Sequence, residues 1–186
     1  NRLMLEAMAR HPQLQVTLML DDRFIDPVQE RMDLSIRIGG ALPPDRVAHP
    51  LAEWPRYLVA SPDYVRSRGK PRKPQDLPRH DYLRYASPDD TLVLDGPDGT
   101  LRIELAARYR VNSAIAMLEA VQAGAGIALQ PSWMVNELLR TGALVRLLPR
   151  WTGPAQVAHL IHAPRRRQPM RVQAIQDLLL ATVPSW

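Results

Sequence analysis

The chain has 186 residues, of which 46% are hydrophobic and 23% charged, with a formal net charge of +5 and no cysteine. This length and apolar content allow one domain or two small ones, and the lack of cysteine excludes disulfides and thiolate metal sites. No apolar run approaches the ~20 residues of a membrane-spanning helix. The positive charge comes almost entirely from dispersed arginines, which favours a solvated surface over a dedicated nucleic-acid interface.

Helices and strands alternate at the start of the chain. Charged residues at four-residue spacing predict a helix over Arg2–Arg10. Residues 14–20 show the alternation of a strand, a short helix is expected over 26–31, and residues 34–38 form the next strand, closed by Gly39 and Gly40. This order predicts that the two strands pair in parallel within one sheet.

The middle of the chain changes from this pattern to shorter strands. Two separate strands are predicted over 47–51 and 57–60, followed by a helix over 63–68. The proline-rich, basic stretch 69–78 is interpreted as a connector between two lobes. Beyond it we predict a strand over 82–85 and a hairpin, with strands over 92–94 and 101–105 around a Gly-Pro-Asp-Gly turn.

The most informative stretch is 108–139. A strand over 108–111 leads into Asn112 and Ser113, which suit a helix N-cap, and Gly124 ends the helix that follows. A second strand covers 127–129, and Pro131 begins another helix over 131–139. The β-α-β-α order predicts a parallel pair with a right-handed crossover, and ligands of such sheets bind at the carboxyl ends of the strands. Strands over 144–147 and 157–161 and a helix after Pro169 complete the chain.

Three positions suit the binding of an anion or a polar ligand, and each has a structural alternative. Arg37 lies on the strand face opposite Leu34, Ile36 and Ile38 and can grip a carboxylate, or it is an exposed charge on a half-solvated strand. The free N–H groups at Asn112 and Ser113 suit an anion, although ordinary helix capping is the favoured explanation of these two residues taken alone.

Several stretches together resemble the effector-binding domain of LysR-type transcriptional regulators. They are DLSIRIG at 33–39, YLVASPDYV at 57–65, GKPRKPQDLPRHDYL at 69–83 and AGAGIALQPSW at 123–133. They follow the family's order and spacing, and the resemblance covers essentially the whole chain. Relatives usually carry an apolar side chain at the position of Gln130, so this amide either bonds a polar ligand or satisfies a local backbone group.

The resemblance implies a two-lobed α/β fold of the periplasmic-binding-protein type 2 kind, each lobe a mixed, mainly parallel sheet flanked by helices. Lobe one is expected over 1–58 and 163–186, and lobe two over 59–162. A winged helix-turn-helix and the first strand of lobe one are expected upstream of Asn1. A small-molecule inducer, polar or anionic, is expected between the lobes, and its identity does not follow from the sequence. The candidate ligand-binding residues are Arg37, Gly39, Gly40, Ser61, Asn112, Ser113 and Gln130.

The helices over 2–10 and 114–123 are too apolar for each to bury only one side. The resemblance implies dimers with antiparallel lobes, which would cover both helices. The candidate interface residues are Leu3, Met4, Ala7, Met8, Met117, Leu118 and Val121. A monomer in which loops or the first strand cover one of these helices is the alternative.

No motif of a nucleophile elbow, a phosphate-binding loop, a dinucleotide site or a zinc protease is present. His159 and His162 lie three residues apart in or beside a strand and would point to opposite faces, so no metal site is expected. We therefore expect no enzyme, no cofactor and no metal. The leading hypothesis is the sensor domain of a cytoplasmic bacterial regulator that binds DNA only through its absent segment. A free-standing solute-binding protein of a transporter is the alternative, and an α/β enzyme with an anion site is a third.

Overall fold

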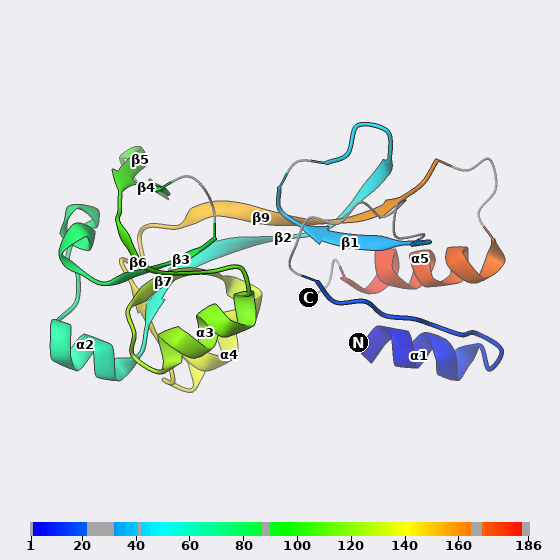
Figure 1. Cartoon of the computed structure of the whole chain (residues 1–186), viewed down its shortest axis with the longest axis horizontal. Helices are drawn as coiled ribbons and strands as arrows, with labels where there is room; N and C mark the ends of the chain where they lie inside the picture. Colours follow the sequence, from blue (N-terminus) through cyan, green and yellow to red (C-terminus); the bar gives the residue numbers. More distant parts are fainter. Residues whose placement is uncertain (1, 22–31, 41, 87–89, 165–168, 184–186) are drawn as a thin grey trace. The chain divides into compact units, whose positions relative to one another are not determined.

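The structure is a computed structural model, and it describes residues 2–21, 32–40, 42–86, 90–164 and 169–183. The chain divides into two compact units, which are coloured along the sequence in Figure 1. Unit 1 comprises Asn1–Glu53 and Val157–Trp186, and unit 2 comprises Trp54–Gln156. Strands β2 (Val47–Ala60) and β9 (Gly153–His162) continue from one unit into the other. The predicted lobe boundaries, 1–58 with 163–186 and 59–162, stay a prediction.

Unit 1 contains two helices and the strand β1 (Ser35–Ile38). β1 is hydrogen-bonded to β9 in antiparallel register, from Ser35 opposite Ile161 to Ile38 opposite Ala158. Helices α1 (Arg2–Arg10) and α5 (Met170–Thr182) contact each other and lie side by side in Figure 1. Each helix buries one apolar row within the described part of unit 1. The buried residues of these rows are Leu3 and Ala7 in α1 and Val172 and Leu179 in α5.

Two predictions for unit 1 are wrong. Residues 14–20 form no strand, although Leu14 and Val16 keep an alternating, half-buried pattern. A strand needs a hydrogen-bonded neighbour, and no described strand pairs with this segment. The parallel pairing expected for 34–38 is therefore replaced by the antiparallel β1–β9 ladder. The helix expected over 26–31 lies outside the described residues.

Unit 2 is built on a mixed sheet in which β7 (Ile127–Pro131), β3 (Tyr82–Tyr85) and β6 (Ala107–Val111) follow β2 in that order. β3 is parallel to both β6 and β7, while β2 is antiparallel to β7 and to β8 (Val145–Leu147). The predicted β-α-β arrangement is therefore present as β6, α3 and β7, with β3 lying between the two strands.

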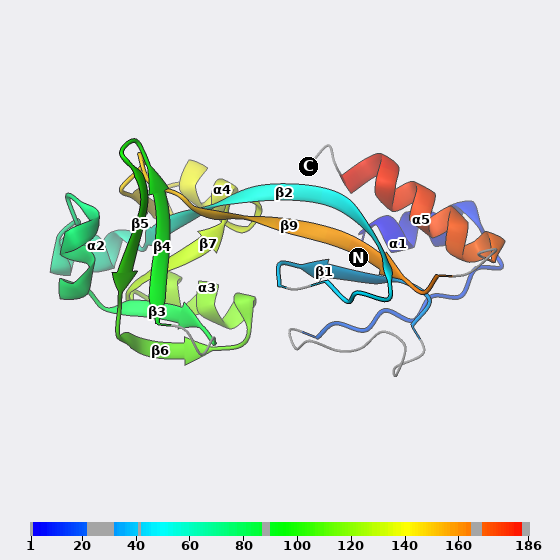
Figure 2. The ribbon, with the colours of Figure 1, turned by 90° about the horizontal axis from the view of Figure 1, so that it is seen from above.

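The two faces of this sheet carry different layers. Helices α3 (Ala114–Gln122) and α4 (Ser132–Arg140) lie on one face, and the hairpin β4 (Thr91–Gly96) and β5 (Gly99–Glu104) lies on the other, as Figures 1 and 2 show. The helix α2 (Pro62–Arg68) and the short 3-10 helix η1 (Pro74–Arg79) complete the unit.

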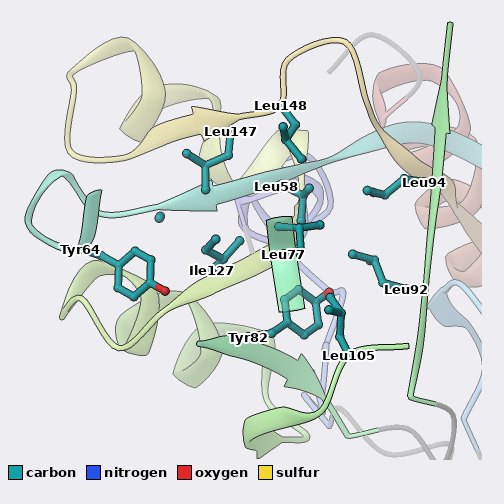
Figure 3. Close-up of a cluster of buried hydrophobic side chains, with 11 residues drawn as sticks. Leu58, Tyr64, Leu77, Tyr82, Leu92, Leu94, Leu105, Ile127, Leu147 and Leu148 are labelled. Atoms are coloured by element: carbon teal, nitrogen blue, oxygen red, sulfur yellow. The ribbon is translucent and has the colours of Figure 1, made fainter. Parts of the chain in front are cut away.

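Each face of the sheet has its own apolar core. The hairpin-side cluster is drawn in Figure 3 and comprises Leu58, Ala60, Tyr64, Leu77, Tyr82, Leu92, Leu94, Leu105, Ile127, Leu147 and Leu148. The helix-side cluster comprises Val59, Leu83, Met117, Val121, Ala128, Val135 and Leu144. Because successive strand residues face opposite sides, Ile127 joins the first cluster and Ala128 the second.

The caps of α3 confirm the local reading of its sequence. The Ser113 hydroxyl accepts a hydrogen bond from the backbone N–H of Ala116 at 3.4 Å. Past the other end of the helix, Gly124 adopts a φ of +80°, a conformation that side chains with a Cβ rarely take. The strand–helix–strand boundaries in this stretch therefore follow from nearby residues alone.

Three further corrections concern segments that contain prolines. The stretch 69–78 does not connect the two units, because it lies wholly within unit 2. Residues 47–60 form one strand through Pro50 and Pro55, and its ladders with β7 and β8 begin beyond both prolines, at Arg56 and at Leu58. Pro131 ends β7 and occupies the N-cap of α4, one position earlier than expected.

Candidate ligand-binding site

Three parallel strands of unit 2 end at one edge of its sheet. The register places Tyr85 beside Val111 and Leu83 beside Ala128. Gln130, two residues beyond Ala128, therefore lies level with the ends of β3 and β6. Ligands of α/β sheets bind at such ends. We call this part of unit 2 the carboxyl edge, made of Tyr85, Asn112, Ser113, Gln130 and Pro131.

At this edge the first turn of α3 offers backbone N–H groups. The Ser113 hydroxyl occupies the N–H of Ala116, which confirms its capping role. The backbone carbonyl of Asn112 accepts a hydrogen bond from the Tyr85 hydroxyl at 2.8 Å, so β3 holds the start of the helix in place. The remaining N–H groups of a first turn have no partner within the helix and carry the positive end of its dipole. This geometry suits a ligand oxygen or anion.

Gln130 is the most unusual side chain of the carboxyl edge. It is 1% exposed, and it shares the helix-side face of β7 with Ala128, which packs with Met117 and Val121 of α3. Its amide nitrogen Nε2 is buried and has no hydrogen-bond partner among the described residues. A buried donor without a partner costs roughly 1–3 kcal/mol. The local backbone bond that we considered as an alternative is therefore not made by this nitrogen.

Two residues near Gln130 were missed by the sequence analysis. Tyr57 lies directly opposite Gln130 in the β2–β7 ladder. The guanidinium carbon of Arg146, on β8, lies 3.8 Å from the centroid of the Tyr57 ring. Arg146 donates from Nη2 to the Pro149 carbonyl at 2.9 Å, while its Nε is buried without a partner among the described residues. The position of Arg146 between the apolar residues of the strand predicted over 144–147 was the sequence feature that could have indicated it.

Ser61, another predicted ligand residue, lies away from the carboxyl edge. β2 runs antiparallel to β7, so residue 61 follows the end of β2 beside the amino end of β7. Its buried hydroxyl accepts a hydrogen bond from the backbone N–H of Tyr64 at 3.2 Å and caps α2. An ideal Cβ built on Gly124 would lie 3.4 Å from this hydroxyl oxygen, which places Ser61 near the end of α3. The structure thus separates Ser61 from Ser113 and Gln130.

The other predicted residues belong to unit 1. Ile36 and Ile38, which share the face of β1 opposite Arg37, are 49% and 43% exposed. β1 is an edge strand that bonds only to β9 among the described strands. Arg37 is half-buried and lies opposite His159. Gly39 and Gly40 follow at φ angles of +69° and +75°, and the Gly39 N–H donates to the Val157 carbonyl at 2.9 Å.

Shifted pKa values in unit 2 arise from its packing and ion pairs. A hydrogen bond from Arg108 holds the pKa of Asp81 below its usual value, and burial raises the pKa of Tyr82 to about 12. Neither residue belongs to the carboxyl edge. Within the described parts of the chain, no three histidine, aspartate or glutamate side chains are grouped to hold a metal ion. The helices of these same parts include none long and apolar enough to cross a membrane.

The predicted dimer residues divide by burial. Leu3, Ala7, Met117 and Val121 are 6%, 3%, 4% and 0% exposed, because each packs inside its own unit. These four side chains are therefore not available to a partner surface. Met4 and Leu118 are half-buried and Met8 is 39% exposed. Leu5 and Ile115, which we did not predict, are 60% and 66% exposed on α1 and α3.

Comparisons with known proteins agree with this architecture. The HTH-type transcriptional activator TtdR of Escherichia coli UTI89 is 34% identical over 179 residues, covering 95% of this chain and 57% of that protein. The HTH-type transcriptional activator AaeR of E. coli K12 is 30% identical over 172 residues, covering 91% of this chain and 55% of that protein. The chain thus spans little more than half the length of these relatives.

Solved structures show the same fold. The regulatory domain of CrgA from Neisseria meningitidis matches with a TM-score of 0.87 at 19% identity, over 98% of this chain and 90% of that one. The full-length Vibrio cholerae virulence activator AphB matches with a TM-score of 0.83 at 24% identity, over 98% of this chain and 62% of that one. The predicted periplasmic-binding-protein type 2-like α/β class is confirmed. The model of the LysR substrate binding domain matches residues 1–184, and the chain therefore belongs to this family.

Proposed function

We propose that this chain is the effector-sensing part of a longer transcriptional regulator, and that a small polar or anionic molecule binds at the carboxyl edge of unit 2. The relatives' printed names support the regulatory role, since TtdR and AaeR are both HTH-type transcriptional activators. In this proposal DNA is bound by a segment outside this chain, and the protein is cytoplasmic and not an enzyme. These names do not favour the alternative of a transporter's solute-binding protein.

The observation that carries the proposal is the buried amide nitrogen of Gln130, which has no partner among the described residues. A ligand oxygen accepting from this nitrogen would remove the cost of the unsatisfied donor. The positive end of the α3 dipole and the guanidinium of Arg146 favour a negatively charged acceptor. A carboxylate attached to a small polar body is therefore the ligand chemistry that best fits the carboxyl edge.

The proposal is tested by thermal unfolding and calorimetry with acetate, succinate, tartrate and benzoate as probes. At least one probe should raise the unfolding temperature of the natural chain, and Gln130→Leu should abolish that rise. Gln122→Leu is the matched control, because it makes the same change at an exposed position on α3. Equal responses of the two variants would exclude Gln130 from the site. No response of the natural chain to any probe would contradict the proposed carboxylate chemistry.

For unit 1, the contributions of Arg37, Gly39 and Gly40 to ligand binding stay predictions. If Arg37 bonds a ligand carboxylate, Arg37→Ala should weaken binding of the responding probe by about 1.5 to 3 kcal/mol, because the contact is charge-assisted. Calorimetry of the two proteins measures this difference. Unchanged affinity would show that Arg37 does not contact the ligand. That result would not bear on the proposed site at the carboxyl edge of unit 2.

We also propose that the protein forms an antiparallel homodimer in which the exposed parts of α1 and α3 are covered. The burial of Leu3, Ala7, Met117 and Val121 narrows this surface. The side chains that remain for contact with a partner are Met4, Leu5 and Met8 on α1 and Ile115 and Leu118 on α3. The exposed apolar residues on both helices support the proposal, because a second copy would remove them from water.

A further inference from the structure

A groove of about 520 Å³ lies in unit 2, on the hairpin side of its sheet. Its walls come from η1, from the turn between β4 and β5, and from the segment 148–151. The buried Leu148 and the half-buried Trp151 form its apolar part, and Thr100 adds a hydroxyl. This volume falls within the ~300–1,000 Å³ of small-molecule sites. We call it the basic groove, for Arg72, Lys73 and Arg150, which line it.

The positive charges of the basic groove outnumber the acidic side chains around them. Arg72, Lys73 and Arg150 are exposed, and none forms an ion pair with a described residue. Asp98 is the one acidic residue among the lining side chains. The Asp76 carboxylate accepts hydrogen bonds from the backbone N–H groups of Arg72 and Lys73 at 2.9 and 3.1 Å, and these bonds, together with the charge of Lys73, lower its pKa. Three cations beside an apolar surface attract an anion that also has an apolar part.

The apolar part of the groove is held in an unusual conformation. Leu148 has a φ of +45°, the one positive value among the described residues other than glycine. The backbone N–H of Trp151 donates a hydrogen bond to the Leu148 carbonyl at 2.8 Å and closes a tight turn. The Trp151 ring lies against Gly96, where an ideal Cβ would stand 2.4 Å from its Cε3 atom. Gly96 therefore leaves the space that the Trp151 indole fills, and the indole lines the same groove as the three cations.

The basic groove is separate from the carboxyl edge. Leu148 and Trp151 belong to, or pack against, the hairpin-side cluster. Gln130 instead shares its strand face with Ala128 of the helix-side cluster. The two places thus lie on opposite faces of one sheet, and one small molecule cannot occupy both.

We propose that the basic groove is a second ligand site, for a small organic anion that joins a carboxylate or phosphate to an apolar ring. The anionic group lies among Arg72, Lys73 and Arg150, and the ring lies against Leu148 and Trp151. This site is independent of the proposed function, since no residue is shared with the carboxyl edge.

Phenyl phosphate is the probe, and the backbone and indole N–H signals of the natural chain are followed by nuclear magnetic resonance. Trp151→Phe assigns the indole signal. At a salt concentration of about 150 mM, where distant surface charges are screened, phenyl phosphate should shift the Trp151 indole and the Thr100 amide with a saturating curve. Inorganic phosphate should bind about tenfold more weakly, because it lacks the ring.

Two double variants with the same change of charge distinguish binding in the basic groove from general attraction to a positively charged protein. Arg72→Glu with Arg150→Glu should weaken phenyl phosphate binding at least tenfold, whereas Arg79→Glu with Arg102→Glu, which makes the same charge change outside the groove, should leave binding within about twofold. All four arginines are exposed, so both variants should unfold at the urea concentration of the natural chain. Equal losses in the two variants, equal affinity for inorganic phosphate, or shifts confined to the carboxyl edge would overturn the proposal.

Discussion

The two units of this chain treat their apolar side chains differently. Unit 2 buries two apolar clusters, one on each face of its sheet, and exposes few large hydrophobic residues. Unit 1 leaves many more of them in water, namely Leu5, Met8, Leu18, Met19, Leu20, Ile36, Ile38, Leu42 and Met170. Unit 2 therefore covers most of its large apolar side chains with its own residues. The described part of unit 1 instead presents surface that further contacts would stabilise.

The largest expected effect on stability comes from comparing one leucine substitution in unit 2 with one in unit 1. Leu58→Ala empties a fully buried position in the hairpin-side cluster of unit 2 and should lower the free energy of unfolding by about 3 to 5 kcal/mol. Leu5→Ala changes a residue that is 60% exposed on α1 and should cost less than about 0.5 kcal/mol. Urea unfolding measures both values, and similar losses would break the contrast.

The second prediction concerns the proposed contact of α1 and α3 with a second copy of the chain. Met8→Glu and Leu118→Arg should each shift the proposed dimer to monomer, because each places a charge without a partner on an apolar contact surface. Sedimentation velocity at micromolar concentration measures the state of each protein. Arg171→Glu is the control, since Arg171 is exposed and lies outside α1 and α3. If the unaltered chain is a monomer at this concentration, the dimer proposal is wrong.

A smaller effect is expected from the ion pairs of unit 2. Asp81 accepts hydrogen bonds from Arg108 at 2.8 Å and Arg68 at 3.0 Å, and its pKa lies below the usual value chiefly because of Arg108. A depressed pKa means that stability is present above the unfolded value of about 3.9 and is lost as pH falls through the folded value.

Asp81→Asn should therefore be less stable than the natural chain at neutral pH and should lose less stability between about pH 5 and pH 3. Urea midpoints across this range measure the difference. Asp177→Asn, at an exposed position on α5, should keep the natural pH dependence. A slope unchanged by Asp81→Asn would assign the acid sensitivity to other carboxylates.

Local sequence patterns were enough for most of unit 2 and for the family. Ser113, Gly124 and the Gly-Pro-Asp-Gly turn act through their nearest neighbours, so the helix and hairpin boundaries could be predicted. The strand expected over 14–20 failed because a strand depends on a partner that may lie anywhere in the chain, and alternation alone does not supply one.

The candidate site was only partly predictable for the same reason. Asn112, Ser113 and Gln130 lie within one short stretch, and the carboxyl-end rule brought them together. Tyr57 lies opposite Gln130 because β2 pairs with β7, and Arg146 lies over the Tyr57 ring because β8 pairs with β2. No local pattern indicates either antiparallel pairing. The same pairing moves Ser61 to the other end of β7, although its helix-capping sequence resembles that of Ser113.

The central claim is that the Gln130 amide is reserved for a ligand, and it is tested most directly without any ligand. The measurement is the free energy of unfolding of Gln130→Leu in urea, compared with the natural chain. Because Nε2 is buried without a described partner, Gln130→Leu should raise the free energy of unfolding by about 1 to 3 kcal/mol. The exposed control Gln122→Leu should change it by less than about 0.5 kcal/mol. A loss of stability in Gln130→Leu would show that the amide already has its partner within the fold and would contradict the account.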